Sequence, residues 1–576
     1  MSYFFLIFTI YILYWYGQLR FYLSRSYSQM PALIYGRIVN LDPNVFHTKK
    51  EIISILNNNG YRNVRYLTSP GEFYIYRNSI DFIRRSFCFP DSNEFNVKIR
   101  LTFYQNILIE IKNLETNCNL SCFRLDPKLI TTIQNSSTKK QLYLSFKKYP
   151  QVFIEILLAV EDRYFYHHNG INFHSIVRAL FENIVAGHTV QGGSTLTQQL
   201  VKNLFLENKR SLLRKINEGL IALIMNLVCG KRYILELYLN KVYLGQEKNE
   251  QIYGFPLASM HYFGKPLSEL SLDQYALLIG MLKGASLYNP WTNPKKALDR
   301  RNLVLYLLLN RHIIDNRLYQ VLIKRSLHVQ DKKRAITSHI VFSKVIRKKI
   351  LQNLKKQVKD LSGLRIFTTL DPVSQEFLDQ AVEQGIPVLK KRMKLEDLEI
   401  AVVIVDRFTG EIRAILGGSN PNYLGFNRAF YAKRSIGSLA KPIIYLTALS
   451  EPDKYQLNTN ILDKPISLEL SNGNFWIPKN SNNMFVGPVM LIDALVHSIN
   501  IPIVNLSIQL GLKKLVNKWL HLGLLKNQIS CIPSISLGAI NLTPIEISQI
   551  FQIIASGGYK SSLSLISTVL SHEGIL

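Results

Sequence analysis

The chain of 576 residues lacks the features of several common protein classes. Beyond residues 1–19 it has no uninterrupted apolar run near the ~20 residues that a membrane-spanning helix needs, which argues against a polytopic membrane protein. Thirty glycines and 21 prolines without a repeat exclude a collagen-like or low-complexity chain. A hydrophobic content of 47% excludes a largely disordered one. The sequence therefore predicts a large globular protein of several domains.

Acidic residues are scarce, with 40 Asp and Glu against 69 Lys and Arg, which gives a formal net charge of +29. Such an excess favours an anionic partner: nucleic acid, a lipid surface or a phosphorylated substrate. The chain is also rich in Ile, Asn, Lys, Tyr and Phe, a mixture that AT-rich coding alone produces. The charge by itself therefore does not identify a partner.

Cysteines number only five. Cys118 and Cys122 have no second pair at metal-ligand spacing, so we expect no zinc site. A disulfide between these two stays undecided, and the cysteines do not settle the redox compartment.

Residues 1–19 contain no charged side chain, and residues 14–16 are Tyr-Trp-Tyr. A 19-residue helix spans about 28 Å, close to the thickness of a bilayer core, and aromatic side chains favour its interface. A cleavable signal peptide is the alternative, but it needs a basic start and an Ala-x-Ala site, which are missing. We expect a transmembrane anchor at 1–19. Arg20 and Arg25 follow it, an asymmetry that disfavours an external body.

The rest of the chain divides by hydrophobic pattern. Residues 31–128 predict a small α+β module with a helix at 49–59 and strands at 72–76, 97–103 and 107–112. Helical patterns dominate residues 139–327, and residues 328–364 are predicted to be a linker. Strand signals return in residues 365–576, where 401–406 and 412–416 predict a hairpin.

Residues 161–170 read Glu-Asp-Arg-Tyr-Phe-Tyr-His-His-Asn-Gly and follow an apolar run at 156–160. An acid at the edge of an apolar wall is desolvated, which raises its pKa toward the range of a general base. Glu161 is therefore a candidate base. The alternative is a surface helix end whose acids pair with Arg163.

Residues 192–199 read Gly-Gly-Ser-Thr-Leu-Thr-Gln-Gln. Ser194 or Thr195 can cap a helix whose free amides face an anion. One half of this helix is apolar, and Gln198, Gln199, Lys202 and Asn203 share the other half. A polar face with a lysine near a helix start suits a phosphate, and an ordinary solvated face is the alternative.

Residues 214–218 read Arg-Lys-Ile-Asn-Glu and open another helix. Arg214 and Glu218 are four residues apart and share a face. Glu218 begins a strongly apolar run, where an ionised carboxylate needs a cation or metal partner. A simple ion pair is the alternative, and we interpret residues 234–240, Ile-Leu-Glu-Leu-Tyr-Leu-Asn, mainly as scaffolding.

Taken in order, these four segments resemble the signatures of the family 51 glycosyltransferases, the peptidoglycan polymerases. The resemblance implies a mostly-α, lysozyme-like domain that polymerises lipid II with inversion. Glu161 is implied as the base that deprotonates the acceptor 4-hydroxyl, and Lys202 and Arg214 as stabilisers of the departing diphosphate. Glu218 is implied to hold a divalent metal ion (Mg²⁺ or Mn²⁺) or to orient the leaving group. Substrate-binding residues implied in addition are Asp162, Phe165, His168, Thr195 and Gln199.

A second signature, Ser438-Leu-Ala-Lys441, is followed by Ser498-Ile-Asn500. With residues 364–371 as its opening, this region resembles a penicillin-binding transpeptidase domain of α+β fold. The resemblance implies that Ser438 attacks a D-Ala-D-Ala carbonyl, that Lys441 activates it, and that Ser498 and Asn500 assist. No Lys-Thr-Gly or Lys-Ser-Gly follows Asn500, so we expect a truncated domain with weak or absent acylation.

Residues 35–37 and 70–73 lie in a region similar to the UvrB-domain-2-like module of bifunctional class A penicillin-binding proteins of the 1B type. That resemblance implies an outer-membrane lipoprotein activator docked at 31–128. Lipid II, the growing glycan strand and the inner membrane are the other implied partners, and nucleic acid is not. We expect a single-pass inner-membrane protein with its catalytic body in the periplasm.

Two other functions remain as alternatives. A lytic enzyme would use Glu161 as an acid, but hydrolysis has no diphosphate for Lys202 and Arg214 to stabilise. A non-enzymatic cell-wall scaffold would not need the signatures at 161–218.

Overall fold

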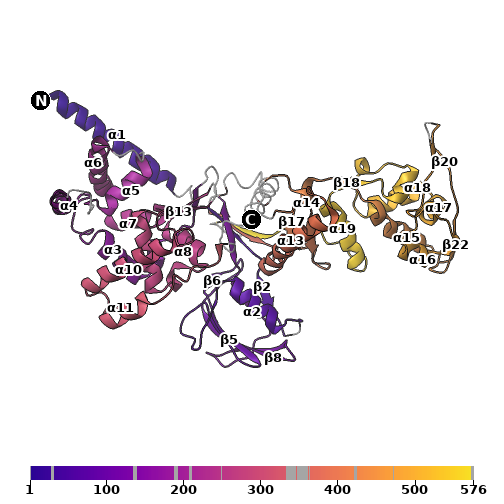
Figure 1. Ribbon diagram of the computed structural model, residues 1–576, viewed down its shortest axis with the longest axis horizontal. Helices are drawn as coiled ribbons and strands as arrows, with labels where there is room; N and C mark the ends of the chain where they lie inside the picture. The colour runs from indigo at the N-terminus through magenta and orange to yellow at the C-terminus, as the bar shows by residue number, and fades with distance from the viewer. Residues whose placement is uncertain are drawn as a thin grey trace. The chain divides into compact units, whose positions relative to one another are not determined.

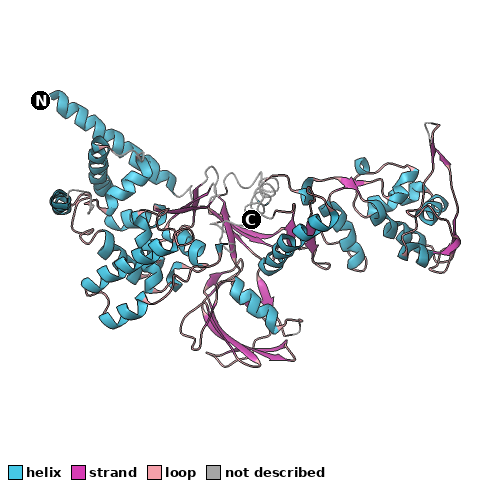
Figure 2. Ribbon diagram, in the orientation of Figure 1, coloured by secondary structure: helices cyan, strands magenta, loops and turns pink. Residues whose placement is uncertain are grey.

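The computed structural model describes residues 2–26, 31–43, 45–133, 139–186, 193–206, 211–247, 250–332, 346, 361, 363–420, 425–470 and 473–571. Figures 1 and 2 show its helices and strands. The chain forms two compact units, Met1–Thr368 with Ile566–Leu576 and Thr369–Leu565. Most of the predicted linker at 328–364 lies outside the described residues. All five cysteines are described and free.

Helix α1 (Ser2–Ser26) extends past the predicted segment 1–19 and packs against α6 (Leu212–Val228). Trp15 contacts Phe205 edge to face, with ring centroids 5.7 Å apart. The described helices include none with the length and apolar character that a bilayer crossing requires. The predicted helix is therefore present, and the predicted membrane span is not confirmed.

The small α+β module has the predicted helix and strands. Helix α2 (Lys49–Asn58) begins with a capping box in which Thr48 and Glu51 bond each other's backbone. The main sheet has the order β3-β4-β5-β8-β9. Its strands are β3 (Arg62–Asn63), β4 (Glu72–Ile75), β5 (Ser79–Arg84), β8 (Val97–Tyr104) and β9 (Ile107–Asn113). Two short pairs accompany it, β2 (Val39–Leu41) with β10 (Phe123–Leu125) and β6 (Phe87–Cys88) with β7 (Asn93–Glu94).

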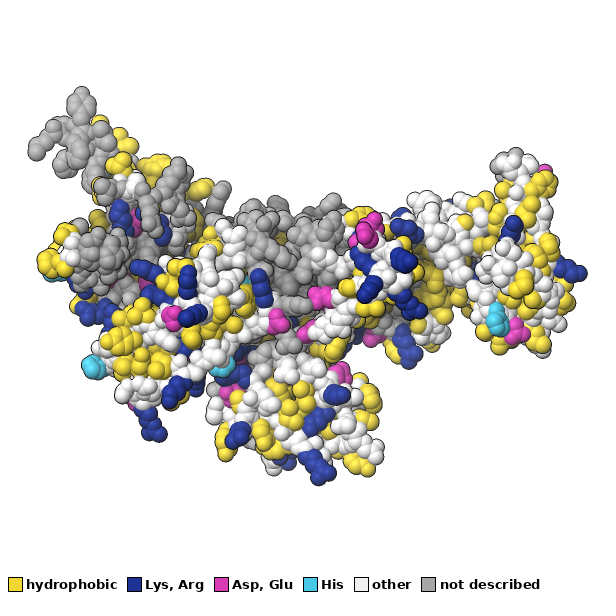
Figure 3. All heavy atoms as spheres, viewed as in Figure 1, with side chains coloured by type: hydrophobic (Ala, Val, Ile, Leu, Met, Phe, Trp, Pro, Cys, Tyr) yellow, Lys and Arg dark blue, Asp and Glu magenta, His cyan; other side chains and the backbone are white. Residues whose placement is uncertain are grey.

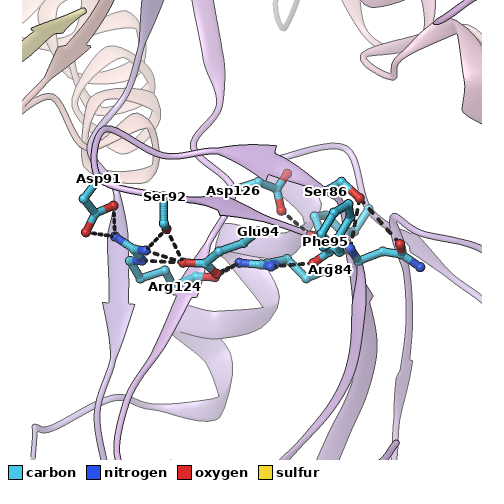
Figure 4. Close-up of polar contacts among 10 residues, drawn as sticks. Arg84, Ser86, Asp91, Ser92, Glu94, Phe95, Arg124 and Asp126 are labelled. Atoms are coloured by element: carbon cyan, nitrogen blue, oxygen red, sulfur yellow. Dashed lines mark hydrogen bonds and ion pairs between the residues drawn. The ribbon is translucent and has the colours of Figure 1, made fainter. Parts of the chain in front are cut away.

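Part of the basic charge of the module is used inside it. Figure 4 shows Arg84 and Arg124 on either side of Glu94, and both pair with its carboxylate. Arg124 also donates to both oxygens of Asp91, at 2.7 and 2.8 Å. Other Lys and Arg side chains are spread over the faces of both units seen in Figure 3. The net charge of the chain therefore includes cations that already have internal partners.

Four distant segments form a second sheet in the same unit, with the order β11-β1-β15-β24. Strand β1 (Ala32–Tyr35) pairs antiparallel with β11 (Leu129–Ile133) and parallel with β15 (Arg365–Thr368). Strand β24 (Ile566–Leu570) pairs antiparallel with β15. A strand that begins at Ala32 and a strand that ends at Leu570 thus belong to one sheet.

The region after this module is mainly helical, as the sequence predicted. It contains α3 (Gln151–Glu161), α4 (Phe173–Ala186), α5 (Leu196–Phe205), α6, α7 (Lys231–Lys241), α8 (Phe255–Phe263), α9 (Leu272–Gly280), α10 (Pro294–Asn310) and α11 (Asn316–Ile323). A small sheet of β12 (Lys139–Gln141), β14 (Glu250–Tyr253) and β13 (Tyr243–Glu247) lies beside them. One apolar core contains side chains from α3, α5, α6, α7, α8 and α9. This shared packing fixes the positions of these helices relative to each other.

The unit Thr369–Leu565 is α+β. The predicted hairpin is confirmed as β16 (Val402–Val405) paired with β17 (Ile412–Leu416). Its helices are α13 (Pro372–Met393), α14 (Arg428–Tyr431), α15 (Lys441–Leu449), α16 (Leu491–Val496), α17 (Asn500–Leu510), α18 (Leu512–His521) and α19 (Pro544–Ala555). Its other strands are β18 (Arg434–Ser435), β19 (Asn460–Asp463), β20 (Leu468–Glu469), β21 (Phe475–Trp476), β22 (Gly487–Met490) and β23 (Asn541–Leu542). A core centred on α15, α17 and α18 supports the Ser438 region.

Candidate active sites

Glu161 is the last residue of α3, whose preceding turns bury Phe153, Ile154, Ile156 and Leu157. Burial raises the pKa of its carboxyl, while a hydrogen bond from Gln199 and the charges of Arg300 and Lys283 lower it. The net shift is upward. The apolar wall that the sequence predicted therefore exists, and Glu161 has the electrostatic setting of a general base.

Asp162 and His168 are held in one network behind Glu161. Asp162 is buried and accepts hydrogen bonds from the backbone N–H of Leu196 at 2.9 Å and from His168 Nε2 at 3.0 Å. The backbone N–H of Gly170 donates to His168 Nδ1 at 3.1 Å, which places the imidazole proton on Nε2. This network fixes the segment after α3 to the start of α5.

Thr195 is the cap of α5, which settles the choice between Ser194 and Thr195. Its hydroxyl accepts from the backbone N–H of Gln198 and donates to the carbonyl of Gly170 at 2.6 Å. The side chain of Gln198 accepts in return from the backbone N–H of Thr195. Gln198 is therefore buried in the cap, and its predicted place on the free polar face is wrong.

Gln199 connects two helices to the candidate base. Its Nε2 donates to Glu161 Oε2 at 3.1 Å, and its Oε1 accepts from the Tyr238 hydroxyl at 2.9 Å. Lys202 follows Gln199 by three residues on α5 and so lies on the same side of the helix.

Lys202 faces a cluster of charges on the first turns of α6. Glu218 is only 2% exposed and pairs with Arg214, at 2.7 Å, and with Lys215. Lys215 also donates to the Ser194 hydroxyl at 2.6 Å. Burial lowers the pKa of Lys202, and the charges of Arg214 and Lys215 lower it further while Glu218 raises it. The predicted cation partner of Glu218 is confirmed: Arg214 and Lys215 both contact its carboxylate, and Lys202 is close enough to feel its charge.

Glu218, the predicted metal ligand, already has cationic partners on its carboxylate. Both oxygens of Glu218 are occupied by Arg214 and Lys215. Within the described ranges no group of three or more His, Cys, Asp or Glu side chains is arranged to hold a metal ion. As arranged here, the residues at Glu218 do not fit a metal ion.

Three of the predicted substrate-binding residues lie behind the site surface. Phe165 is 0% exposed and lies in the core, where Lys231 Nζ is 4.7 Å from its ring centroid. Asp162 and Thr195 are buried and use their polar atoms in the contacts described above. All three side chains are packed away from solvent, and direct substrate contact by them stays a prediction.

In the other unit, Ser438 lies in a short 3₁₀ turn, Gly437–Ala440, that leads into α15. The Ser438 side chain is exposed, and its hydroxyl accepts from the Ser498 hydroxyl at 3.3 Å. Ser498 has a φ of +52°, a conformation that non-glycine residues adopt at a cost. The fold therefore brings Ser438, the predicted nucleophile, and the Ser-x-Asn segment together across 60 residues.

Lys441 is the first residue of α15 and is 1% exposed. Its Nζ donates to Ser498 Oγ at 3.0 Å and to Asn500 Oδ1 at 2.8 Å. Burial lowers the pKa of Lys441 to about 8, so a base is available near neutral pH. Ser438, Lys441, Ser498 and Asn500, predicted from two separate motifs, form one cluster.

Sequence reasoning missed Lys215 and Tyr238. Lys215 stands three residues before Glu218, a helical spacing that could have identified it as a second partner. Tyr238 falls in the segment 234–240 that we interpreted as scaffolding. A buried tyrosine in an apolar helix looks like core, so no sequence signal reveals its bond to Gln199.

Comparisons with known proteins identify the domains in which the two candidate sites lie. Residues 126–308 match the transglycosylase model, 41–125 the bifunctional transglycosylase second domain, and 400–573 the penicillin-binding protein transpeptidase domain. Penicillin-binding protein 1B of Buchnera aphidicola from Acyrthosiphon pisum is 53% identical over 99% of this chain and 75% of its own length. The protein of the same name from Escherichia coli K12 is 52% identical over 95% of this chain and 65% of its own length. The one from Haemophilus influenzae is 42% identical over 97% of this chain and 72% of its own length. With these matches added to the two assembled sites, the chain belongs to the penicillin-binding protein 1B family.

Proposed function

We propose that the chain polymerises lipid II into glycan strands with inversion at the anomeric carbon, and that this activity is joined to a D-Ala-D-Ala transpeptidase domain. The observation that supports the polymerase most directly is the arrangement on α5. Gln199 bonds the desolvated carboxyl of Glu161, and Lys202, three residues on, faces Arg214, Lys215 and Glu218. The candidate base at the end of α3 and the cationic cluster on α6 thus face the same side of α5.

Each residue has a definite task in the proposed reaction. Glu161 removes the proton from the acceptor 4-hydroxyl as that oxygen attacks the anomeric carbon of the donor. The leaving diphosphate gains charge as the bond breaks, and Lys202, Arg214 and Lys215 stabilise it. Glu218 holds Arg214 and Lys215 in position before substrate arrives, so that little reorganisation is needed during the reaction.

A lipid-linked substrate and a place at the inner membrane belong to the same proposal, with one span and the catalytic body in the periplasm. A cavity of about 1090 Å³ lies between α1 and α6, lined mainly by apolar and aromatic side chains. Exposed apolar residues also follow one side of α4: Phe173, Val177, Phe181, Ile184 and Val185. Such surfaces favour contact with lipid over contact with water.

Two further parts of the proposal concern ligands. An outer-membrane lipoprotein activator at 31–128 is supported by the match of 41–125 to the second domain of bifunctional transglycosylases. A divalent metal ion at Glu218 stays a prediction without support from the geometry, because Arg214 and Lys215 occupy its carboxylate. No step is assigned to a metal ion.

The decisive experiment is Glu161→Gln in the full chain with lipid II in detergent. We expect loss of chain growth, because the amide keeps the shape of the side chain but cannot accept the hydroxyl proton. Glu155→Gln is the matched control, since Glu155 is an exposed glutamate on the same helix. Substantial chain growth by Glu161→Gln would reject the proposal, and cleavage of finished glycan by the unaltered protein would favour the lytic alternative.

A further inference from the structure

Tyr238 lies on α7 and is 0% exposed. Its hydroxyl donates to Gln199 Oε1 at 2.9 Å, and Gln199 Nε2 donates to Glu161 Oε2 at 3.1 Å. Burial, followed by the charges of Glu161 and Asp162, raises the pKa of Tyr238 well above its ordinary value. The phenol therefore keeps its proton, and its hydroxyl remains a donor at every working pH.

The two ends of the Gln199 amide have nearly the same shape, so hydrogen-bond partners decide which end faces Glu161. In the observed orientation the amide N–H faces the carboxylate, which favours the ionised form of Glu161. In the flipped orientation the amide oxygen would face Glu161 and favour the protonated acid. The phenolic hydrogen of Tyr238 would also lose its acceptor, which is costly in a buried site.

We propose that Tyr238 is a positioning residue of the glycosyltransferase reaction: it fixes the Gln199 amide so that the amide donates to Glu161 and keeps this base ionised. The inference rests on the proposed role of Glu161. It assigns to the segment 234–240 a function beyond scaffolding.

The other charged groups around Glu161 would not change in a Tyr238 variant. Asp162, the next residue, raises the pKa of Glu161, and Arg300 on α10 and Lys283 after α9 lower it. Gln199 on α5 is the hydrogen-bond donor among these influences. A change in the titration of Glu161 after loss of the Tyr238 hydroxyl is therefore attributable to the Gln199 amide.

The test is the pH dependence of kcat/KM for lipid II polymerisation by Tyr238→Phe in the full chain. We expect the acidic limb to move to higher pH by about 0.5–1 unit, because one hydrogen bond shifts an equilibrium by roughly three- to tenfold. Tyr275→Phe is the matched control: this buried hydroxyl donates to the carbonyl of Leu267, also at 2.9 Å. The acidic limb of the pH profile of Tyr275→Phe should stay at the pH of the unaltered protein.

A double-variant cycle shows whether Tyr238 acts through Gln199. In a Gln199→Met background, Tyr238→Phe should cause no further shift of the limb. Replacing Tyr238 by 3-fluorotyrosine keeps the ring and makes the hydroxyl a stronger donor, so the limb should move to lower pH. This replacement decides the question even if Tyr238→Phe folds poorly in thermal unfolding.

Two outcomes overturn the inference and are separable from failure of the proposed function. An unmoved limb in both Tyr238 variants, with Glu161→Gln inactive, rejects the role of Tyr238 alone. A shift of equal size in the Gln199→Met background rejects action through Gln199. An active Glu161→Gln rejects the proposed function itself.

Discussion

Single side chains set the charge balance around Glu218. Its carboxylate is almost fully buried and pairs with Arg214 and Lys215. If these two side chains moved away into water, the negative charge of Glu218 would stay buried without a partner, which is costly. Lys202 stands beside this pair with its own charge partly desolvated. A charge that is already desolvated acts strongly on a second charge that develops near it.

Lys202→Met tests that effect directly. We expect kcat/KM for lipid II polymerisation to fall by about 100-fold, because the leaving diphosphate loses one preorganised cation. Lys295→Met is the control, since Lys295 is an exposed lysine on α10. Equal activity of the two variants would show that Lys202 does not meet the leaving group.

Removal of divalent metal ions gives a second test at this scale. Arg214 and Lys215 already neutralise Glu218, so we expect polymerisation in detergent to continue after treatment with excess EDTA. The initial rates with EDTA and with added Mg²⁺ are the measurement. A loss of activity that Mg²⁺ restores would establish the metal requirement that the family resemblance allows.

At the scale of elements, α5 and α6 are placed by the loop that follows α3. Gly170 in this loop has a φ of +94°, and a Cβ added to it would lie 2.4 Å from the carbonyl oxygen of Ala222 on α6. The carbonyl oxygen of Gly170 accepts a hydrogen bond from the Thr195 hydroxyl, and its backbone N–H donates one to His168 Nδ1. One glycine thus holds the loop, the cap of α5 and the side of α6 together.

Gly170→Ala should therefore destabilise this part of the molecule by about 2–4 kcal/mol, from backbone strain and the clash with Ala222. Thermal unfolding and amide hydrogen exchange in α6 measure the effect. Gly230→Ala is the control, because Gly230 has a φ of −64° and open space around its added Cβ, and it should change stability by less than about 1 kcal/mol. Similar values for both variants would contradict the packing argument.

At the scale of the whole molecule, the two catalytic clusters lie in different units of the chain. Ser438, Lys441, Ser498 and Asn500 are assembled by hydrogen bonds across about 60 residues of sequence. The cluster around Ser438 is therefore built entirely within the unit Thr369–Leu565.

The sequence predicted the helices and strands in which hydrophobic residues recur at a regular spacing. It also predicted helical side-chain partners that are four residues apart, such as Arg214 and Glu218. It could not predict contacts that depend on tertiary packing. Gln198 looked like a member of the polar face, but its side chain bonds the backbone of Thr195 instead. Tyr238 looked like core because nothing local shows that α7 brings its hydroxyl to Gln199.

The antiparallel pairing of β15 and β24 determines whether the segment between these two strands can be deleted. Thr368 and Ile566 are register partners, so the chain leaves this sheet and returns to it at facing positions. Facing residues of an antiparallel pair are only about 4.5–5.5 Å apart, a gap that a tight turn of two residues closes. A deletion of residues 369–565, with Asn-Gly joining Thr368 to Ile566, would therefore keep all four strands of this sheet. The unit Thr369–Leu565 is an insertion between two adjacent strands and can be removed without changing the order of the strands.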